Sequence, residues 1–136
     1  MDIQRFNLEG SGLTRVLGEL AAPIMDAVWE GEAVTVKEIC AALGPDVHYK
    51  TVLTVTNRLV EKGLLVRERT RDRAFVYRPT VSRDAFLDQV MTSVASGLVE
   101  DFGRQALAHF VQVADDLDPT YLEELELLVR ARKGSR

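Results

Sequence analysis

The stretch of residues 48–79 constrains the fold more than any other, because helix, stop and strand signals follow one another in it. Its first part predicts a helix over residues 49–62, in which apolar side chains at three- and four-residue spacing share one face. These side chains are Val52, Val55 and Leu59. Gly63 then suits the left-handed end of that helix. The remaining faces of the helix are polar and are expected to stay in water.

The second part of this stretch, residues 65–79, predicts a β-hairpin. β-Branched and aromatic side chains lie on either side of a polar tetrapeptide, residues 70–73, which suits a turn. Val34, further upstream, is placed to add a short third strand. A helix followed directly by a hairpin is therefore the unit around which the rest of the chain is organised.

Positive charge is concentrated in the same stretch. Residues 48–79 hold eight Lys or Arg against three acidic residues, in a chain whose net charge is −4 at pH 7. A basic patch on an acidic chain is expected of a protein that binds a phosphate backbone. Charge alone fits a solvated hairpin equally well, so the neighbouring elements decide between the two interpretations.

Two shorter helices are predicted before this unit. Apolar residues recur at three and four over residues 17–28. Pro23 is tolerated in a first helical turn, so the helix is expected either to begin near Leu20 or to be kinked at Pro23. The tetrapeptide Thr-Val-Lys-Glu at residues 35–38 is a capping box, which marks the start of the next helix. Gly44 and the proline after it end that helix.

A short capped helix, a turn containing glycine and a longer helix form a helix-turn-helix, and a basic hairpin after them makes the winged version. The sequence therefore predicts a mainly α fold with a small β wing, in which a winged-helix DNA-binding domain occupies residues 13–80 after a flexible lead-in at residues 1–12. The DNA-contacting residues expected on helix 49–62 and wing 65–79 are Lys50, Thr51, Leu53, Thr54, Asn57, Arg58, Arg71 and Arg73.

These residues are expected to have different roles. The N-terminal half of the second helix of a helix-turn-helix meets the base edges in the major groove. Lys50 and Arg58 suit phosphate or guanine, while the two threonines offer a hydroxyl and a methyl to base edges. Leu53 and Asn57 are expected at the rim of the groove. The wing-tip arginines are expected to contact phosphate or the minor groove.

The last part of the chain, residues 81–136, predicts three amphipathic helices. Ser82 and Asp118 mark two helix starts, and Gly97 and Gly103 bracket an interruption. These helices have no evident core of their own, so they must pack either on the winged domain of the same chain or on the same helices of a second chain. We expect the second, a helical dimerisation arm, as in a twofold dimer that reads a pseudo-palindromic operator. The side chains expected at the dimer interface are Phe86, Leu87, Val90, Met91, Val94, Leu107, Phe110, Val111, Leu122, Leu125 and Leu128.

Metal, cofactor and catalytic chemistry are not indicated by the sequence. Cys40, His48 and His109 are scattered along the chain, whereas a metal site needs ligands at matched spacing. The sequence contains no Gly-rich phosphate loop and no nucleophile–base arrangement. We therefore expect no enzyme activity, no metal and no cofactor. One cysteine, no signal peptide and no apolar run of about 20 residues favour a cytoplasmic protein.

Several segments resemble the penicillinase and methicillin-resistance repressor family. They are residues 17–29, Thr35-Val36-Lys37-Glu38-Ile39, residues 51–55 with Arg58-Leu59-Val60-Glu61-Lys62-Gly63-Leu64, and residues 74–79. The resemblance covers about residues 13–132 and is most specific in the winged module. It implies a dimeric winged-helix repressor that binds operators of β-lactamase or related genes.

The resemblance also implies how such a repressor is released. Inducible members of the family are cleaved in the helical arm after a membrane sensor with a metalloprotease domain detects an antibiotic. The corresponding place here is Asp101-Phe102, where the family often has Asn before Phe. A copper-responsive branch carries paired cysteines near the C-terminus, and this chain has none there, which disfavours copper sensing.

Two other functions remain open from the sequence. The helical arm of a winged-helix regulator can frame a pocket for a small molecule, in which case a ligand rather than a protease would release the DNA. Alternatively, the winged helix can serve as a protein-interaction module. A gel shift at low salt tests the last alternative, since such a module gives no specific band.

Overall fold

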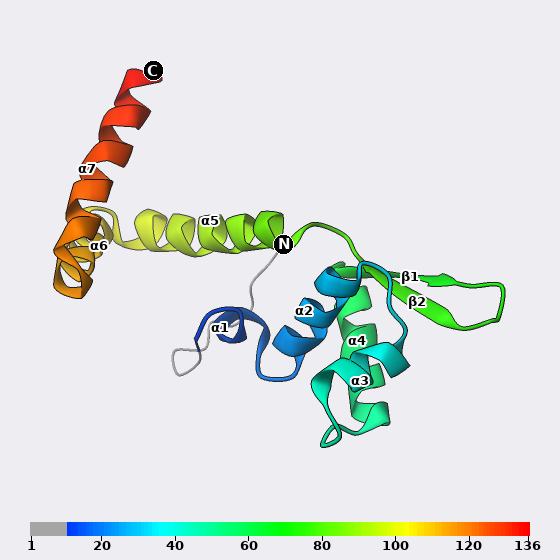
Figure 1. The fold of residues 1–136 in the computed structure, drawn as a ribbon. Coiled ribbons are helices and arrows are strands. Elements are labelled where there is room, and N and C mark those ends of the chain that lie inside the picture. The colour runs from blue at the N-terminus through cyan, green and yellow to red at the C-terminus, as the bar shows by residue number, and fades with distance from the viewer. Residues whose placement is uncertain (1–10) are drawn as a thin grey trace. The chain divides into compact units, whose positions relative to one another are not determined.

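The computed structural model describes residues 11–136, so residues 1–10 of the predicted lead-in lie outside the described residues. Helices and strands follow the predicted order (Figure 1). They are α1 (Thr14–Leu17), α2 (Ala21–Gly31), α3 (Val36–Leu43), α4 (Tyr49–Glu61), β1 (Leu65–Arg69), β2 (Phe75–Pro79), α5 (Arg83–Phe102), α6 (Arg104–Leu117) and α7 (Pro119–Gly134). The mainly helical fold with a small β wing is confirmed.

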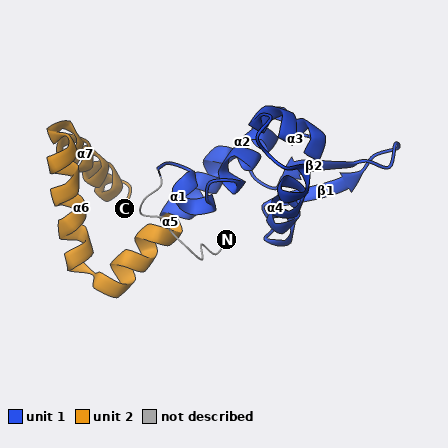
Figure 2. Cartoon of the chain, turned by 90° about the horizontal axis from the view of Figure 1, so that it is seen from below, with its two compact units in different colours: residues 1–91 blue, residues 92–136 orange. Residues whose placement is uncertain are grey.

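The chain divides into two compact units, one ending at Met91 and the other comprising Thr92–Arg136 (Figure 2). The boundary lies within α5, whereas the sequence suggested a boundary at residues 80 and 81. None of the helices in the described range is long and apolar enough to cross a membrane.

Helices α2 and α3 of unit 1 begin where the sequence predicted. The N-cap of α2 is Leu20, so Pro23 lies in the first turn, where its missing N–H is not needed. Thr35 caps α3 through a complete capping box, in which its Oγ1 accepts from the Glu38 N–H at 3.1 Å. The short helix α1 was not predicted.

α4 packs on α2 and α3 through the predicted face, with one addition. Val52 and Leu59 are buried, whereas Val55 is half-buried. The fully buried partner on this face is Thr56, one turn after Val52, and its hydroxyl donates to the Val52 carbonyl oxygen at 2.7 Å. This hydrogen bond satisfies the hydroxyl, so a threonine can occupy a core position.

β1 and β2 form an antiparallel hairpin directly after α4. Gly63 has φ of 82°, which confirms the left-handed helix end, and the strands pair from Leu65 with Pro79 to Arg69 with Phe75. The predicted third strand is reduced to one bridge, in which the Val34 N–H donates to the Tyr77 carbonyl oxygen at 3.0 Å. The hairpin is thereby held against the segment between α2 and α3.

α5 starts at its predicted cap but runs further than predicted. Ser82 Oγ accepts from the Ala85 N–H at 3.1 Å, so the N-terminal cap is confirmed. Gly97 lies inside the helix, and the interruption occurs at Gly103, where φ is 51°. The interruption that the sequence placed between Gly97 and Gly103 is thus confined to Gly103, because an isolated glycine such as Gly97 weakens a helix by only about 1 kcal/mol.

The first half of α5 belongs to the core of unit 1. Phe86 and Val90 are buried there, and the Phe86 ring lies beside the ring of Trp29 on α2, with their centroids 5.5 Å apart. Their assignment to the dimer interface is therefore wrong, because these side chains already have partners within their own chain. The first part of the apolar stripe of α5 therefore packs within unit 1, which periodicity alone does not reveal.

Candidate nucleic-acid interface

The first half of α4 presents a polar face on the side away from the core. Lys50, Thr51, Thr54 and Arg58 are all exposed, while Val52 on the opposite side is fully buried. The helix is long enough, with 13 residues, to present its first turns to a groove while its last turns remain packed. The structure therefore brings these four predicted residues together on one surface.

Thr54 is held by its own helix. Its Oγ1 donates to the Lys50 carbonyl oxygen at 2.9 Å. This bond uses the hydroxyl hydrogen and leaves the oxygen lone pairs and the methyl group facing solvent. In this rotamer the side chain offers an acceptor and an apolar contact, which suit an exocyclic amino group and a thymine methyl.

Leu53 and Asn57, predicted at the groove rim, are both half-buried. The Asn57 side chain is engaged with the hairpin, because its Oδ1 accepts from Tyr77 Oη at 3.0 Å and from Arg67 Nη1 at 3.2 Å. Asn57 therefore joins α4 to the hairpin, a relationship that no local pattern in the sequence indicates.

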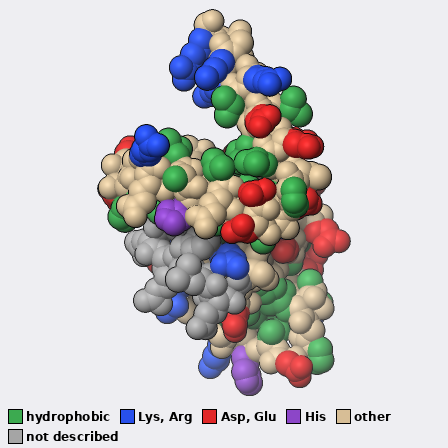
Figure 3. All heavy atoms as spheres, turned by 90° about the vertical axis from the view of Figure 1, so that its left-hand side faces the viewer, with side chains coloured by type: hydrophobic (Ala, Val, Ile, Leu, Met, Phe, Trp, Pro, Cys, Tyr) green, Lys and Arg blue, Asp and Glu red, His purple; other side chains and the backbone are tan. Residues whose placement is uncertain are grey.

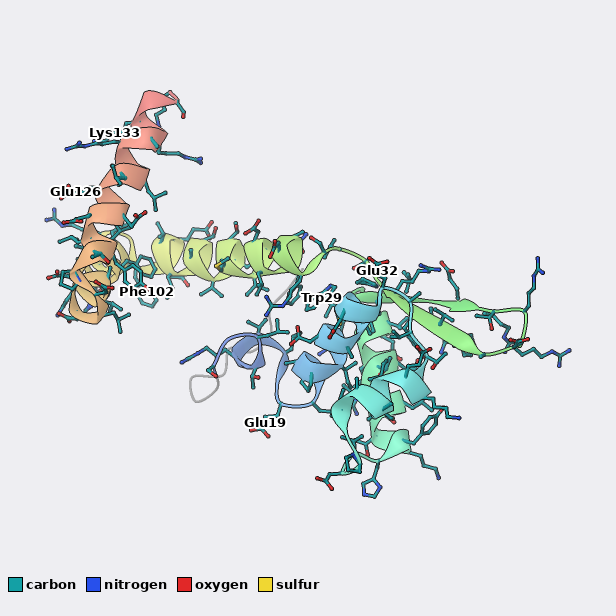
Figure 4. All side chains as sticks on the ribbon, viewed as in Figure 1. Glu19, Trp29, Glu32, Phe102, Glu126 and Lys133 are labelled. Atoms are coloured by element: carbon teal, nitrogen blue, oxygen red, sulfur yellow. The ribbon has the colours of Figure 1, made fainter. Side chains whose placement is uncertain are left out.

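Two of the exposed cations of the hairpin lie at its turn. Arg71 and Arg73 are exposed, and Arg73 has φ of 63° in a turn closed by the Thr70 N–H, which donates to the Ala74 carbonyl oxygen at 2.8 Å. Side chains ending in nitrogen extend from this end of the hairpin (Figure 4). Both predicted wing-tip residues are thus placed where an anion could reach them.

Two further arginines on β1 were not singled out from the sequence. The guanidinium groups of Arg67 and Arg69 lie over the Phe75 ring, at 4.6 and 5.1 Å from its centroid. Stacking on an aromatic ring holds a cation in place without neutralising it. Arg78, by contrast, is 3.5 Å from a carboxylate oxygen of Glu68, so its charge is partly balanced.

Tyr49 is a further exposed residue that the sequence analysis missed. It begins α4 directly before Lys50, and 54% of its surface is exposed. Its position in the first turn of the predicted helix, next to Lys50, is a signal that could have identified it. A tyrosine at this position can stack on a sugar or base, or donate a hydrogen bond to phosphate.

Unit 2 leaves much of its apolar surface in water. Of the side chains predicted at the dimer interface, Leu107, Phe110, Val111 and Leu128 are exposed, and Leu122 and Leu125 are half-buried. Figure 3 shows hydrophobic side chains distributed among acidic ones over these helices. Further exposed apolar residues are Val113, Leu117, Leu127 and Val129.

The remaining predicted interface residues lie on α5. Met91, in the last turn of unit 1, is exposed, while Leu87 and Val94 are half-buried. At the end of α5, Asp101 and Phe102 are exposed, and the helix breaks directly after them at Gly103 (Figure 4). The predicted cleavage point is thus a helix end.

α7 begins with the predicted cap. The Asp118 carboxylate accepts from the Thr120 N–H at 3.0 Å and from the Thr120 hydroxyl at 2.9 Å. These bonds favour the charged form and lower the pKa of Asp118 below its ordinary value, the backbone N–H contributing most. Lys and Arg side chains gather at the other end of this helix (Figure 3).

Comparison with known proteins identifies what this chain is similar to. The model of the penicillinase repressor family matches residues 17–131. The transcriptional regulators BlaI of Mycobacterium tuberculosis strains CDC 1551 / Oshkosh and ATCC 25618 / H37Rv are each 38% identical over 112 residues, which is 78% of this chain and 80% of the relative. The match spans both compact units.

Proposed function

The chain belongs to the penicillinase repressor family and is a transcriptional repressor of the BlaI type, and from this premise we propose that it binds a pseudo-palindromic operator as a homodimer. Each subunit inserts the exposed face of α4 into the major groove and lays its hairpin along the backbone. The operators lie at β-lactamase or related genes, and the chain acts in the cytoplasm, without enzyme activity.

The observation that carries this proposal is the position of Thr51 and Thr54. Both are exposed on α4 between Lys50 and Arg58, while the opposite face of the same helix is buried. Hydroxyl and methyl groups flanked by cations suit direct readout of base edges beside phosphate contacts. A winged helix that served only protein contacts would have no need for this combination.

The exposed apolar side chains of unit 2 support the homodimer. Phe110 and Leu128 are 41% and 64% exposed, on helices whose apolar stripes are too long for a solvated surface. A second copy supplies the matching surface through a twofold axis. The α4 helices of the two subunits then match the two halves of a palindrome.

Release of the operator is proposed to follow cleavage between Asp101 and Phe102. Both residues are exposed at the end of α5, where a helix frays most readily. The proposed partner is a membrane sensor with a protease domain. Mass spectrometry of the chain recovered from β-lactam-treated cells tests this step, and fragments ending at Asp101 are expected.

Footprinting of the purified chain on genomic fragments tests the function directly. A protected site with two related halves, about one helical turn or a small multiple of it apart, is expected. Loss of the footprint on adding a small molecule, with the chain intact, would instead favour a ligand-responsive regulator. Absence of any specific band at low salt would leave a protein-interaction module and overturn the proposal.

A further inference from the structure

One amide oxygen on α4 holds both strands of the hairpin. Asn57 Oδ1 accepts from Tyr77 Oη at 3.0 Å and from Arg67 Nη1 at 3.2 Å, and these two donors sit directly opposite each other in the pairing of β1 with β2. We call these three residues, Asn57, Tyr77 and Arg67, the helix–wing junction.

Each donor of the junction is held from a second direction. Tyr77 is 1% exposed, and its backbone N–H donates to the Val34 carbonyl oxygen at 2.7 Å. The Arg67 guanidinium lies over the Phe75 ring. Because both donors are fixed independently of Asn57, the two hydrogen bonds define the direction of the hairpin relative to α4.

The hydroxyl of Tyr77 is not needed to fill space. A phenylalanine would occupy the same buried site without a polar atom that requires a partner. A partnered hydroxyl adds little net stability, since hydrogen bonds to protein replace those to water, but it adds a directional constraint. The junction is therefore better suited to fix geometry than to hold the fold together.

We propose that the helix–wing junction determines operator specificity by positioning the hairpin relative to α4, without itself contacting a base. The inference rests on the proposed function. In the proposed complex, α4 contacts base edges and the hairpin tip contacts the DNA backbone. When the angle between α4 and the hairpin is fixed, both sets of contacts form together on only one DNA geometry. Random DNA requires no such match, because phosphate contacts form in many registers.

The test uses the full-length chain with Tyr77→Phe, which removes one hydroxyl. Dissociation constants are measured for the footprinted operator and for a random duplex of equal length over a series of salt concentrations. Affinity for the operator should fall about tenfold, because each of two subunits loses one positioning bond. Affinity for the random duplex, and the slope of log K against log salt, should not change, since every cation is retained.

Tyr121→Phe is the matched control, because it removes the hydroxyl of an exposed tyrosine on α7. It should leave both affinities unchanged. A Tyr77→Phe variant that retains the operator-to-random affinity ratio overturns the inference. A parallel loss on both duplexes also overturns it, because a merely structural role lowers the folded fraction and affects all DNA equally.

Asn57→Ala tests the same inference by removing the acceptor that Tyr77 and Arg67 share. Because Asn57 and Tyr77 act through one bond, the double variant should lose no more specificity than Asn57→Ala alone. If the losses of specificity in the two single variants multiply in the double variant, the two residues act independently, and the inference is overturned. Wild-type chain that does not distinguish operator from random duplex would instead overturn the proposed function itself.

Discussion

The ring of Trp29 on α2 and the ring of Phe86 on α5 lie with their centroids 5.5 Å apart and their planes tilted by 45°. The Trp29 indole N–H also donates to the Val81 carbonyl oxygen at 3.0 Å, just before α5 begins. Arg83 adds an exposed ion pair with Asp26 at 3.2 Å. The first turns of α5 are thus part of the winged unit, and the helix is anchored there.

Truncation of the buried ring at this anchor should destabilise unit 1. Phe86→Ala removes a fully buried side chain, for which a loss of about 3–5 kcal/mol in the free energy of unfolding is expected. Urea titration followed by Trp29 fluorescence measures it. Tyr49→Ala, an exposed aromatic in the same unit, should change stability by less than about 0.5 kcal/mol. Equal losses of stability in the two variants would contradict the role of Phe86 in anchoring α5 to unit 1.

Removal of a wing-tip cation should weaken binding to all sequences. If each subunit neutralises about 3–4 phosphates, the dimer should show a slope of log K against log salt of roughly −5 to −7. Arg71→Ala removes one contact from each subunit, so the slope should become shallower by about 2. Arg130→Ala, an exposed cation on α7, serves as the control, and an identical change there would argue against a specific role for the hairpin.

Removal of a side chain that contacts bases should weaken binding to the operator much more than binding to random DNA. Thr54→Ala deletes the exposed hydroxyl and methyl on α4, and operator affinity should fall by about 1–3 kcal/mol per lost base contact. Affinity for random duplex should hardly change. Gel shifts on both duplexes measure this, with the exposed Thr92→Ala as control. Equal loss on random DNA would contradict the assignment of Thr54 to base readout.

A charge placed on the exposed apolar surface of unit 2 should separate the subunits. Leu128→Asp places a carboxylate at a residue that is 64% exposed and is proposed to be covered by the second copy. The dimer dissociation constant should rise at least about tenfold, because burying an unpaired charge is costly. Sedimentation equilibrium measures the change. Gln112→Asp adds the same charge at an exposed polar position of α6, and dissociation by both variants alike would count against this surface.

The cap of α7 should stabilise the helix in a pH-dependent way. Hydrogen bonds from Thr120 lower the pKa of Asp118, so its stabilising effect is fully present above the ordinary value of 3.8 and is lost as pH falls through the lowered pKa. Asp118→Ala should therefore lower the melting temperature at pH 7, and the difference from wild type should narrow at strongly acidic pH. A difference independent of pH would show that the charge of Asp118 does not act at the helix end.

The sequence predicted most elements because their signals are local. Thr35 and Glu38 form their capping box within one turn, and Gly63 supplies the left-handed end of α4. The same holds for Asp118, which caps α7 through a residue two positions away. Signals of this kind depend on neighbours in the chain and do not require knowledge of the packing. The order of these helices and strands could therefore be predicted from the sequence.

The candidate site was predicted in part. The exposure of Thr51 and Thr54 follows from the apolar face on the other side of the same helix. Tyr49 was missed because it lies in line with the apolar stripe, three residues before Val52, and only the packing leaves it exposed at the start of α4. Asn57 was assigned to the groove rim, and its hydrogen bonds to the hairpin come from residues ten and twenty positions further along the chain. Contacts between residues so far apart in the sequence depend on how the strands fold back onto α4.

By itself the sequence determined which segments are helical, where they start and stop, and where positive charge is concentrated, because these properties depend on residues a few positions apart. Only the tertiary structure decided what each apolar stripe packs against. It buried Thr56 in the core, gave Phe86 and Val90 to unit 1 and left Leu128 exposed. The physical reason is that periodicity indicates which face avoids water, whereas the partner of that face is fixed by contacts between distant parts of the chain.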